Sequence, residues 1–231
     1  MNRLIAPLLL TTFLATSPAH SASVYSQGAN PNTFSRSDVE FGRIMTDDFV
    51  LGATTNVLSV SWQGAYWNDG VAPASDDFTI RFFADGGGVP TGAPIATYTV
   101  GNNVNRQAAG FSFPAGFTFP VYDYSANLPA GIVFTAGTTV WLSIENDAPG
   151  SKQWGWGTIF PDSSSILNPA YRSSDGGVTW PESWTNNTLT FSLNDTPAVP
   201  EPVAPGLMAL GALTGLLRRK RPAASRCSSS R

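Results

Sequence analysis

The tryptophan side chains are the residues of this sequence best suited to hold a ligand. Six of the seven tryptophans are candidates for a sugar-binding surface: Trp62, Trp67, Trp154, Trp156, Trp180 and Trp184. Sugars stack their C–H faces on exposed aromatic rings, so several tryptophans on one surface would form a carbohydrate-binding site. Trp154 and Trp156 are two residues apart and would share one face of a strand, and the flanking Gly155 and Gly157 would leave the backbone there open. The alternative is that the rings fill the core of a β domain, and the sequence leaves both interpretations open.

Catalytic chemistry is limited by the scarcity of histidine and cysteine. The sequence contains one histidine, His20, and one cysteine, Cys227, each close to an end of the chain. If both ends are removed on export, the mature domain has no imidazole, no thiol and no disulfide. Ser-His-Asp and Cys-His catalysis, and zinc, iron or haem sites ligated by histidine, are then excluded.

Acidic residues occur in two adjacent pairs, Asp47-Asp48 and Asp76-Asp77. Calcium needs only carboxylate and carbonyl oxygens, so bound Ca²⁺ is possible, although the sequence has no EF-hand spacing and names no metal ligand. Neighbouring residues on a strand point to opposite faces, so such a pair can chelate one ion only from a loop. A glycoside hydrolase that uses two carboxylates also stays open, but no pair of acids is identified. The sequence therefore predicts no catalytic residue and no cofactor beyond a possible Ca²⁺.

The N-terminal residues 1–22 have the pattern of a secretory signal peptide. Arg3 supplies the positive start, residues 4–14 form a mostly apolar core, and small residues before position 23 offer a cleavage site. The pattern predicts export. The folded part of the chain is then expected at residues 23–197, which is enough for one domain with a sizeable core.

An apolar segment with basic residues behind it lies near the C-terminus. The run 203–217 contains fifteen residues, and as a helix it reaches about 22 Å, less than the roughly 30 Å hydrocarbon core of a bilayer. The run is preceded by Pro200, Glu201 and Pro202. It is followed by a basic stop cluster, which consists of Arg218, Arg219, Lys220 and Arg221. The basic cluster predicts that the C-terminal side lies in the cytoplasm. A transmembrane helix this short suits a transient anchor better than a permanent one.

The order of a Pro-Glu-Pro motif, an apolar helix and a basic cluster at residues 198–221 resembles the PEP-CTERM sorting signal of bacterial secreted proteins. The resemblance implies recognition by exosortase, a membrane-embedded cysteine protease that removes the anchor. It also implies an association with exopolysaccharide and with biofilm formation. We expect a protein that is exported through the inner membrane, anchored there transiently, and then found at the cell surface or outside the cell. Residues 222–231 are expected to form a disordered tail rich in serine and basic residues.

Removing the two ends changes the charge of the protein. The whole chain has a formal net charge of −3. Residues 23–199 contain six basic residues and fifteen acidic residues, which gives a net charge of −9. Nucleic-acid binding needs a basic face, so an acidic domain of this kind predicts no nucleic-acid partner.

The local pattern between the two ends is all-β. Short runs rich in Val, Ile, Thr and aromatic residues recur between clusters of Gly, Pro, Asn and Asp. Nine such runs are predicted strands: residues 48–51, 57–62, 78–84, 94–100, 117–124, 132–135, 139–145, 153–159 and 189–193. Alternation in two of the runs predicts these inward-facing residues: Phe78, Ile80, Phe82, Val140, Leu142 and Ile144. The number and spacing of the strands predict an antiparallel β-sandwich of jelly-roll type.

The segment from Ser173 to Trp180 resembles the Asp-box of sialidases and other propeller proteins, whose pattern is Ser-x-Asp-x-Gly-x-Thr-Trp. In that motif the Asp and Ser side chains bond the amides of a hairpin turn, and the Trp packs underneath. The chain has one copy and too few residues for a propeller. The resemblance therefore predicts the hairpin geometry and not the sialidase activity.

Three functions follow from these observations. The first is a non-enzymatic surface or extracellular-matrix protein, processed by exosortase and associated with exopolysaccharide. The second is a dedicated carbohydrate-binding module that uses exposed tryptophans. The third is a glycoside hydrolase that uses only carboxylates. The exposure of the tryptophan rings, and whether they line one groove, distinguishes between them.

Overall fold

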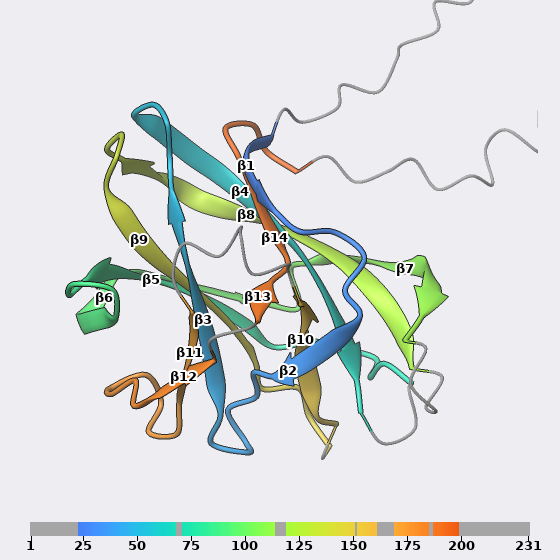
Figure 1. Ribbon diagram of the computed structural model, residues 1–231. Coiled ribbons are helices and arrows are strands. Elements are labelled where there is room, and N and C mark those ends of the chain that lie inside the picture. The colour runs from blue at the N-terminus through green and yellow to red at the C-terminus, as the bar shows by residue number, and fades with distance from the viewer. Residues whose placement is uncertain are drawn as a thin grey trace, which may run out of the picture. The chain divides into compact units, whose positions relative to one another are not determined.

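The computed structural model describes residues 23–67, 71–113, 119–150, 152–160, 169–184 and 187–198. These residues form two antiparallel β-sheets and no helix, which confirms the all-β prediction (Figure 1). Accordingly, no helix of membrane-spanning length and apolarity occurs in this part of the chain. The predicted signal peptide, the sorting motif, the apolar run, the basic cluster and the C-terminal tail all lie outside the described residues.

The first sheet has eight strands. They are β1 (Ser23–Gln27), β2 (Thr33–Arg36), β4 (Thr55–Tyr66), β7 (Asn105–Ser112), β8 (Pro120–Phe134), β10 (Trp154–Ile159), β13 (Thr188–Leu189) and β14 (Phe191–Asn194). The central path runs β1-β14-β4-β10-β13, while β8 pairs with β4, β7 pairs with β8, and β2 pairs with β10. The first and last described strands, β1 and β14, are therefore neighbours in one sheet.

The second sheet has six strands in the order β12-β11-β3-β9-β5-β6. Their bounds are β3 (Ile44–Val50), β5 (Phe78–Asp85), β6 (Pro90–Gly101), β9 (Thr139–Asn146), β11 (Ala170–Ser173) and β12 (Glu182–Trp184). Every strand pairing in both sheets is antiparallel, as the short connections and the alternating patterns predict.

The main core lies between the two sheets. The six residues predicted to face inward on β5 and β9 are all buried, so the alternation identified their faces correctly. Aromatic rings from the first sheet meet them: Trp62 stacks on Tyr124 with a centroid distance of 5.6 Å, and Phe78 contacts Trp62 edge-to-face at 5.1 Å. Aromatic side chains thus supply much of the buried area of this core.

The Asp-box hairpin covers the outer face of the second sheet. The Ser173 hydroxyl accepts hydrogen bonds from the amides of Asp175 and Gly177, and the Asp175 carboxylate accepts them from the amides of Val178 and Thr179. Trp180 packs edge-to-face on Phe83 at 5.3 Å. The predicted hairpin geometry is confirmed. Because the hairpin covers this face, the second face of β9 is buried as well.

The strand predictions miss mainly the short strands. The runs at residues 48–51, 57–62, 78–84, 94–100, 139–145, 153–159 and 189–193 all fall within or overlap described strands. The described parts of the runs 117–124 and 132–135 belong to one strand, β8. Strands β1, β2, β7, β11 and β12 were not predicted, because their side chains are mostly polar or only half-buried. Such strands form because a neighbouring strand offers them hydrogen bonds, and not because of an apolar pattern.

Candidate functional site: an aromatic and arginine cleft between the sheets

The six candidate tryptophans divide into two groups according to burial. Trp62, Trp154 and Trp156 are 3%, 0% and 0% exposed, and all three belong to the main core. Trp180 is 8% exposed and lies under the Asp-box hairpin. No sugar can stack on a ring that solvent does not reach, so the prediction of a glycan-binding role is corrected for these four residues. The remaining two, Trp67 and Trp184, are half-buried.

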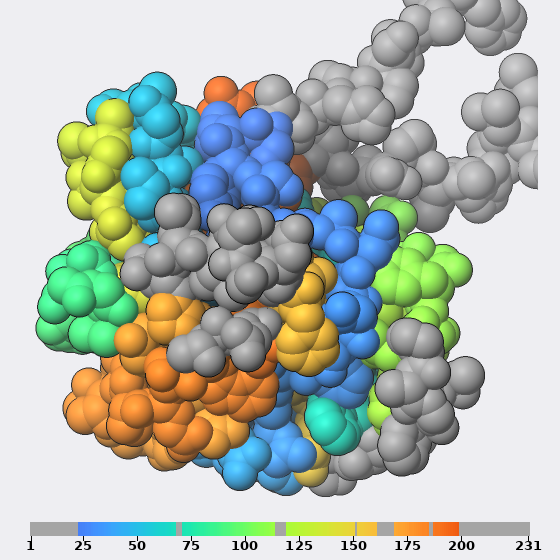
Figure 2. All heavy atoms as spheres, viewed as in Figure 1, coloured from blue at the N-terminus to red at the C-terminus, as the bar shows by residue number. Residues whose placement is uncertain are grey.

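Trp67 and Trp184 line the same cleft. The cleft has a volume of about 180 Å³, and these described residues line it: Phe34, Ser35, Arg36, Arg43, Met45, Trp67, Arg172 and Trp184. They come from β2 and the end of β4 in the first sheet, and from β3, β11 and β12 and the segment before β3 in the second (Figure 1). In Figure 2 the blue segment around β2 and the orange segment of β11 and β12 lie on the same face of the molecule. The cleft therefore lies where an edge of one sheet meets an edge of the other.

Two glycines on β10 allow β2 to approach closely. Gly155 lies opposite Arg36 and Gly157 lies opposite Phe34 in the antiparallel pairing. A Cβ atom on Gly155 would lie 2.4 Å from Cδ2 of Phe34, which leaves no room for any side chain there. The alternating Trp-Gly pattern thus sends both tryptophan rings into the core and seats the Phe34 ring on the opposite face. The sequence interpretation that these glycines leave the backbone open is wrong, because Phe34 covers Gly155.

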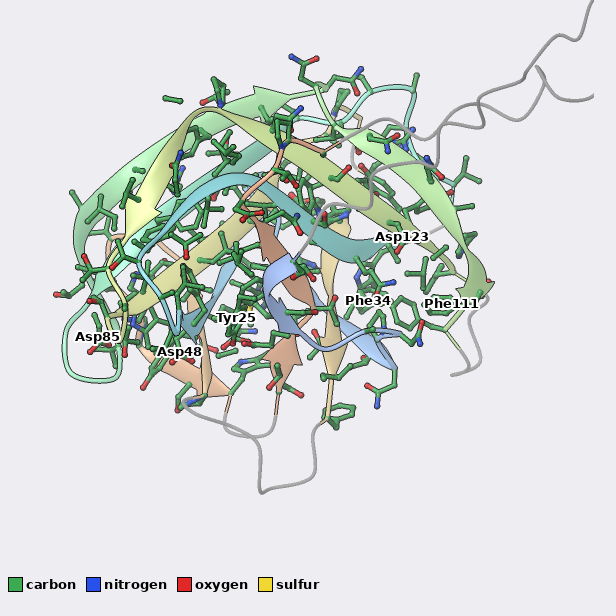
Figure 3. The ribbon with its side chains drawn as sticks, turned by 90° about the horizontal axis from the view of Figure 1, so that it is seen from above. Tyr25, Phe34, Asp48, Asp85, Phe111 and Asp123 are labelled. Atoms are coloured by element: carbon green, nitrogen blue, oxygen red, sulfur yellow. The ribbon has the colours of Figure 1, made fainter. Side chains whose placement is uncertain are left out.

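Phe34 in turn holds Trp67 at the wall of the cleft. The two rings meet edge-to-face at a centroid distance of 4.6 Å. Phe34 also contacts Phe113 at 4.8 Å and Phe119 at 6.0 Å, within the third apolar cluster of the domain. Figure 3 shows Phe34 and Phe111, another member of that cluster, at the same end of the molecule. Trp67 is therefore held from behind, while its ring lines the cleft.

An arginine lies against each cleft tryptophan. The guanidinium carbon of Arg36 lies 5.6 Å from the centroid of Trp67 and 5.3 Å from that of Phe41. The guanidinium carbon of Arg172 lies 5.4 Å from the centroid of Trp184. Cation–π contacts of this kind hold planar guanidinium groups in place and leave their N–H edges available for hydrogen bonds.

The charge of the cleft differs from that of the rest of the domain. Three of the described lining residues are arginines and none is an acid. Arg172 donates a hydrogen bond to Glu182, its partner across the β11–β12 pairing. Among the described residues, no carboxylate forms an ion pair with Arg36 or Arg43. Arg36 and Arg43 thus have no ion-pair partner within the described part of the chain, although residues 23–199 carry a net charge of −9.

Substituting Gly155 tests how the cleft is built. We expect Gly155→Ala to destabilise the protein by about 1–3 kcal/mol, because the new methyl group overlaps a Phe34 ring that other rings hold in place. Gly52→Ala is the matched control, since a Cβ there has no atom within 4 Å, and we expect its change to stay within about 0.5 kcal/mol. Urea unfolding followed by tryptophan fluorescence measures both. Equal stability of the two variants would contradict the described packing of β2 on β10.

One member of each acidic pair, Asp47 and Asp76, serves the fold through its carboxylate. Asp47 is fully buried in β3, where its carboxylate accepts hydrogen bonds from Gln27 Nε2 at 2.6 Å and from the amide of Leu189 at 2.7 Å. Tyr25 lies on the same side of the domain as Asp48 (Figure 3), and its pKa is raised by burial and by the charges of Asp47 and Asp48. Within the described residues, no group of three or more His, Cys, Asp or Glu side chains is arranged to hold a metal ion. The predicted possibility of Ca²⁺ therefore has no described site.

Several buried carboxyl groups have raised pKa values. Burial raises the pKa of Glu145 to about 7, against the opposing attraction of Arg81, whose Nη2 lies 2.6 Å from Glu145 Oε1. Burial also raises the pKa of Asp38 to about 6 and that of Asp47 well above its usual value. Between about pH 4.5 and 7 the folded domain thus binds more protons than the unfolded chain. The free energy of unfolding then decreases as the pH rises.

We expect the protein to be more stable at pH 5 than at pH 8. A single carboxyl group that is protonated in the folded protein and ionised in the unfolded chain changes the unfolding free energy by at most about 1.4 kcal/mol per pH unit. The unfolding temperature should therefore drop by several degrees between pH 5 and pH 8. Glu145→Gln removes one titrating group and should flatten the pH dependence. Thermal unfolding at a series of pH values measures this. A stability that rises steadily from pH 5 to pH 8 would contradict the raised pKa values.

The cleft arginines and Phe34 were not predicted as site residues. Arg36 and Arg172 are 136 positions apart in the sequence, and no spacing rule connects them. The sequence offers one indication, which is that basic residues are rare in the domain. Residues 23–199 contain six of them, and half of these are Arg36, Arg43 and Arg172. Their convergence depends on the pairing of β2 with β10 and of β11 with β3.

A family model described as a domain of unknown function, DUF7901, matches residues 23–196. Neither the curated proteins nor the solved structures give a match to the chain. The matched range contains all the described strands and all the described residues that line the cleft. The chain therefore belongs to the DUF7901 family.

Proposed function

We propose that this protein is an exported, non-enzymatic surface or matrix protein whose jelly-roll-type domain binds a saccharide in the cleft between Trp67 and Trp184. In this proposal residues 1–22 direct export, and the short apolar helix anchors the protein transiently. Exosortase then cuts near Pro200, Glu201 and Pro202. The domain associates with exopolysaccharide at the cell surface or outside the cell.

The observation that carries the proposal is the position of the two half-buried tryptophans. Trp67 and Trp184 come from different sheets and line one cleft, whereas the other four candidates are buried. Half-exposed rings beside a concave surface are suited to stacking on a sugar ring, and nearby N–H donors are suited to its hydroxyl groups. The cleft is below the roughly 300 Å³ at which typical ligand pockets begin, so it has room for about one sugar ring.

Binding is favoured over hydrolysis by the composition of the cleft. A glycoside hydrolase requires two carboxyl groups that face the bond to be cleaved. None of the described residues that line the cleft is an acid. Two of the five described buried acids, Asp47 and Asp76, accept hydrogen bonds from the protein itself.

A polysaccharide pull-down with neutral and acidic polymers tests the saccharide site. We expect Trp184→Ala to weaken binding at least tenfold, because stacking of one ring contributes on the order of 1 kcal/mol or more beyond the area that it buries. Phe160→Ala is the control, since Phe160 is 57% exposed and does not line the cleft. Failure to retain any polysaccharide, or equal retention of the two variants, would refute the site.

The sorting part of the proposal has a separate test. Mass spectrometry of the extracellular protein should find a C-terminus near Pro200–Pro202. An extracellular form that still contains Cys227 would contradict processing by exosortase.

A further inference from the structure

We infer that the saccharide bound in the cleft carries a carboxylate, as a uronic acid does. The inference rests on the proposed function, because it specifies the ligand of the same site. It adds that charge, and not stacking alone, selects the sugar.

The first argument is the uncompensated charge at the cleft. Arg36 and Arg43 both line it, and neither forms an ion pair with a described carboxylate. The other arginines of the described domain differ: Arg81 is paired with Glu145, Arg106 with Asp76, and Arg172 with Glu182. A strongly acidic domain that leaves two arginines unpaired at one concavity is complementary to an anionic group there.

The second argument is the geometry of Arg36. Its guanidinium carbon lies within 6 Å of the ring centroids of both Phe41 and Trp67, and the group makes no hydrogen bond with a described residue; its Nε atom is buried, which leaves the two terminal nitrogens to meet a ligand. Contacts with two aromatic rings restrain the group without using its N–H donors. A planar guanidinium with free donors matches the two oxygens of a carboxylate in a bidentate arrangement. The side chain is therefore positioned before any ligand arrives, which lowers the entropy cost of binding.

The third argument is that ring and charge are presented together. The Trp184 and Trp67 side chains line the same cleft as the arginines, and each ring has a guanidinium group against it. A uronic acid carries a carboxylate directly on a ring with apolar C–H faces, so one such residue satisfies both features. A neutral sugar would leave the arginines unused, and an acidic peptide would offer no saturated ring for the tryptophans.

Three polymers separate these contributions. Polygalacturonate has the sugar ring and the carboxylate, fully methyl-esterified polygalacturonate has the ring without the charge, and polyglutamate has the carboxylate without the ring. We expect the purified full-length protein to bind polygalacturonate at least tenfold more tightly than either of the other two, as measured by isothermal titration calorimetry at constant ionic strength. Tighter binding of the esterified polymer or of polyglutamate would overturn the inference.

Arg36→Gln and Arg43→Gln test whether the preference arises in the cleft. Each should lower the affinity for polygalacturonate at least tenfold and reduce the preference for polygalacturonate over the esterified polymer. Gly52→Asp is the control, because it changes the net charge by the same −1 at an open position at the other end of β3 from the cleft. It should change the affinity less than threefold. If Gly52→Asp weakens binding as much as the arginine variants do, the preference reflects overall charge and the assignment to the cleft is wrong.

The outcome also separates this inference from the proposed function. If both forms of the polymer bind equally well and Trp184→Ala still abolishes binding, the saccharide site stands and the carboxylate specificity falls. If the protein binds neither form, the saccharide site itself falls.

Discussion

Trp154→Ala is expected to destabilise the protein by about 3–5 kcal/mol, the cost of removing a large aromatic side chain from a packed core. The Trp154 ring is 0% exposed and contacts Phe78 edge-to-face at 5.0 Å and Tyr124 at 6.2 Å. It also covers Gly64 so closely that a Cβ there would lie 2.6 Å from Cζ2 of the indole. Surroundings this tight cannot collapse into the cavity that the substitution leaves. Thermal unfolding should show a decrease of roughly 6 to 20 °C in Tm.

The matched control is the same substitution at Trp184. Because Trp184 is half-buried at the cleft, Trp184→Ala should cost much less stability while it removes the proposed sugar contact. The two variants thus separate a core tryptophan from a surface one. If Trp154→Ala does not fold, Trp154→Phe can be measured instead, and it should lose less unfolding free energy than the alanine variant. A Trp154→Ala protein within about 1 kcal/mol of wild type would contradict the burial of this ring.

Asp76→Ala is the second substitution with a large expected effect, again about 3–5 kcal/mol, because it removes the ion-pair partner of the half-buried Arg106 and the acceptor of the buried Tyr66 hydroxyl. Arg106 Nη1 donates to Asp76 Oδ2 at 2.8 Å, and Tyr66 donates its hydroxyl hydrogen to Asp76 Oδ1. Asn146 in turn donates to the Tyr66 hydroxyl at 2.8 Å. Burial keeps the pKa of Tyr66 far above its usual value, so the hydroxyl stays a neutral donor. Removing the carboxylate breaks the bonds from Arg106 and Tyr66 and leaves the Tyr66 hydroxyl hydrogen without its acceptor.

Asp77→Ala is a close control for this network. Asp77 is the next residue, is exposed, and contributes to the described hydrogen bonds through its backbone. We expect its effect to stay within about 0.5 kcal/mol. Urea unfolding of both variants at pH 7 measures the difference. If Asp76→Ala and Asp77→Ala unfold at the same urea concentration, the network does not stabilise the fold as described.

The periodic parts of the fold could be predicted because their physical cause is local. On β5 and β9 every second residue is apolar, and the faces that this pattern indicates are the buried ones. The Asp-box hairpin could be predicted for a similar reason, since its hydrogen bonds join residues at most four positions apart. In both cases the interacting side chains are close in the sequence.

The burial of the tryptophans could not be predicted, because it depends on distant partners. Trp154 and Trp156 share a face, as the sequence indicates, but whether that face meets solvent or the other sheet is a property of the assembled domain. The second face of β10 illustrates the same limit. Gly155 suggests an open backbone, and Phe34, which is 121 positions earlier, fills that space.

The sequence by itself determined the all-β class, the acidic charge of the domain and its lack of histidine and cysteine between the two ends, because composition and period-2 alternation are properties of the chain alone. Only the tertiary structure decided which tryptophans remain accessible to solvent and which arginines line the same cleft. Trp67 and Trp184 meet at one cleft because β2 pairs with β10 and β12 with β11, and these pairings join residues that are far apart in the sequence. Contacts of that kind follow from the packing of the two sheets and leave no spacing pattern in the sequence.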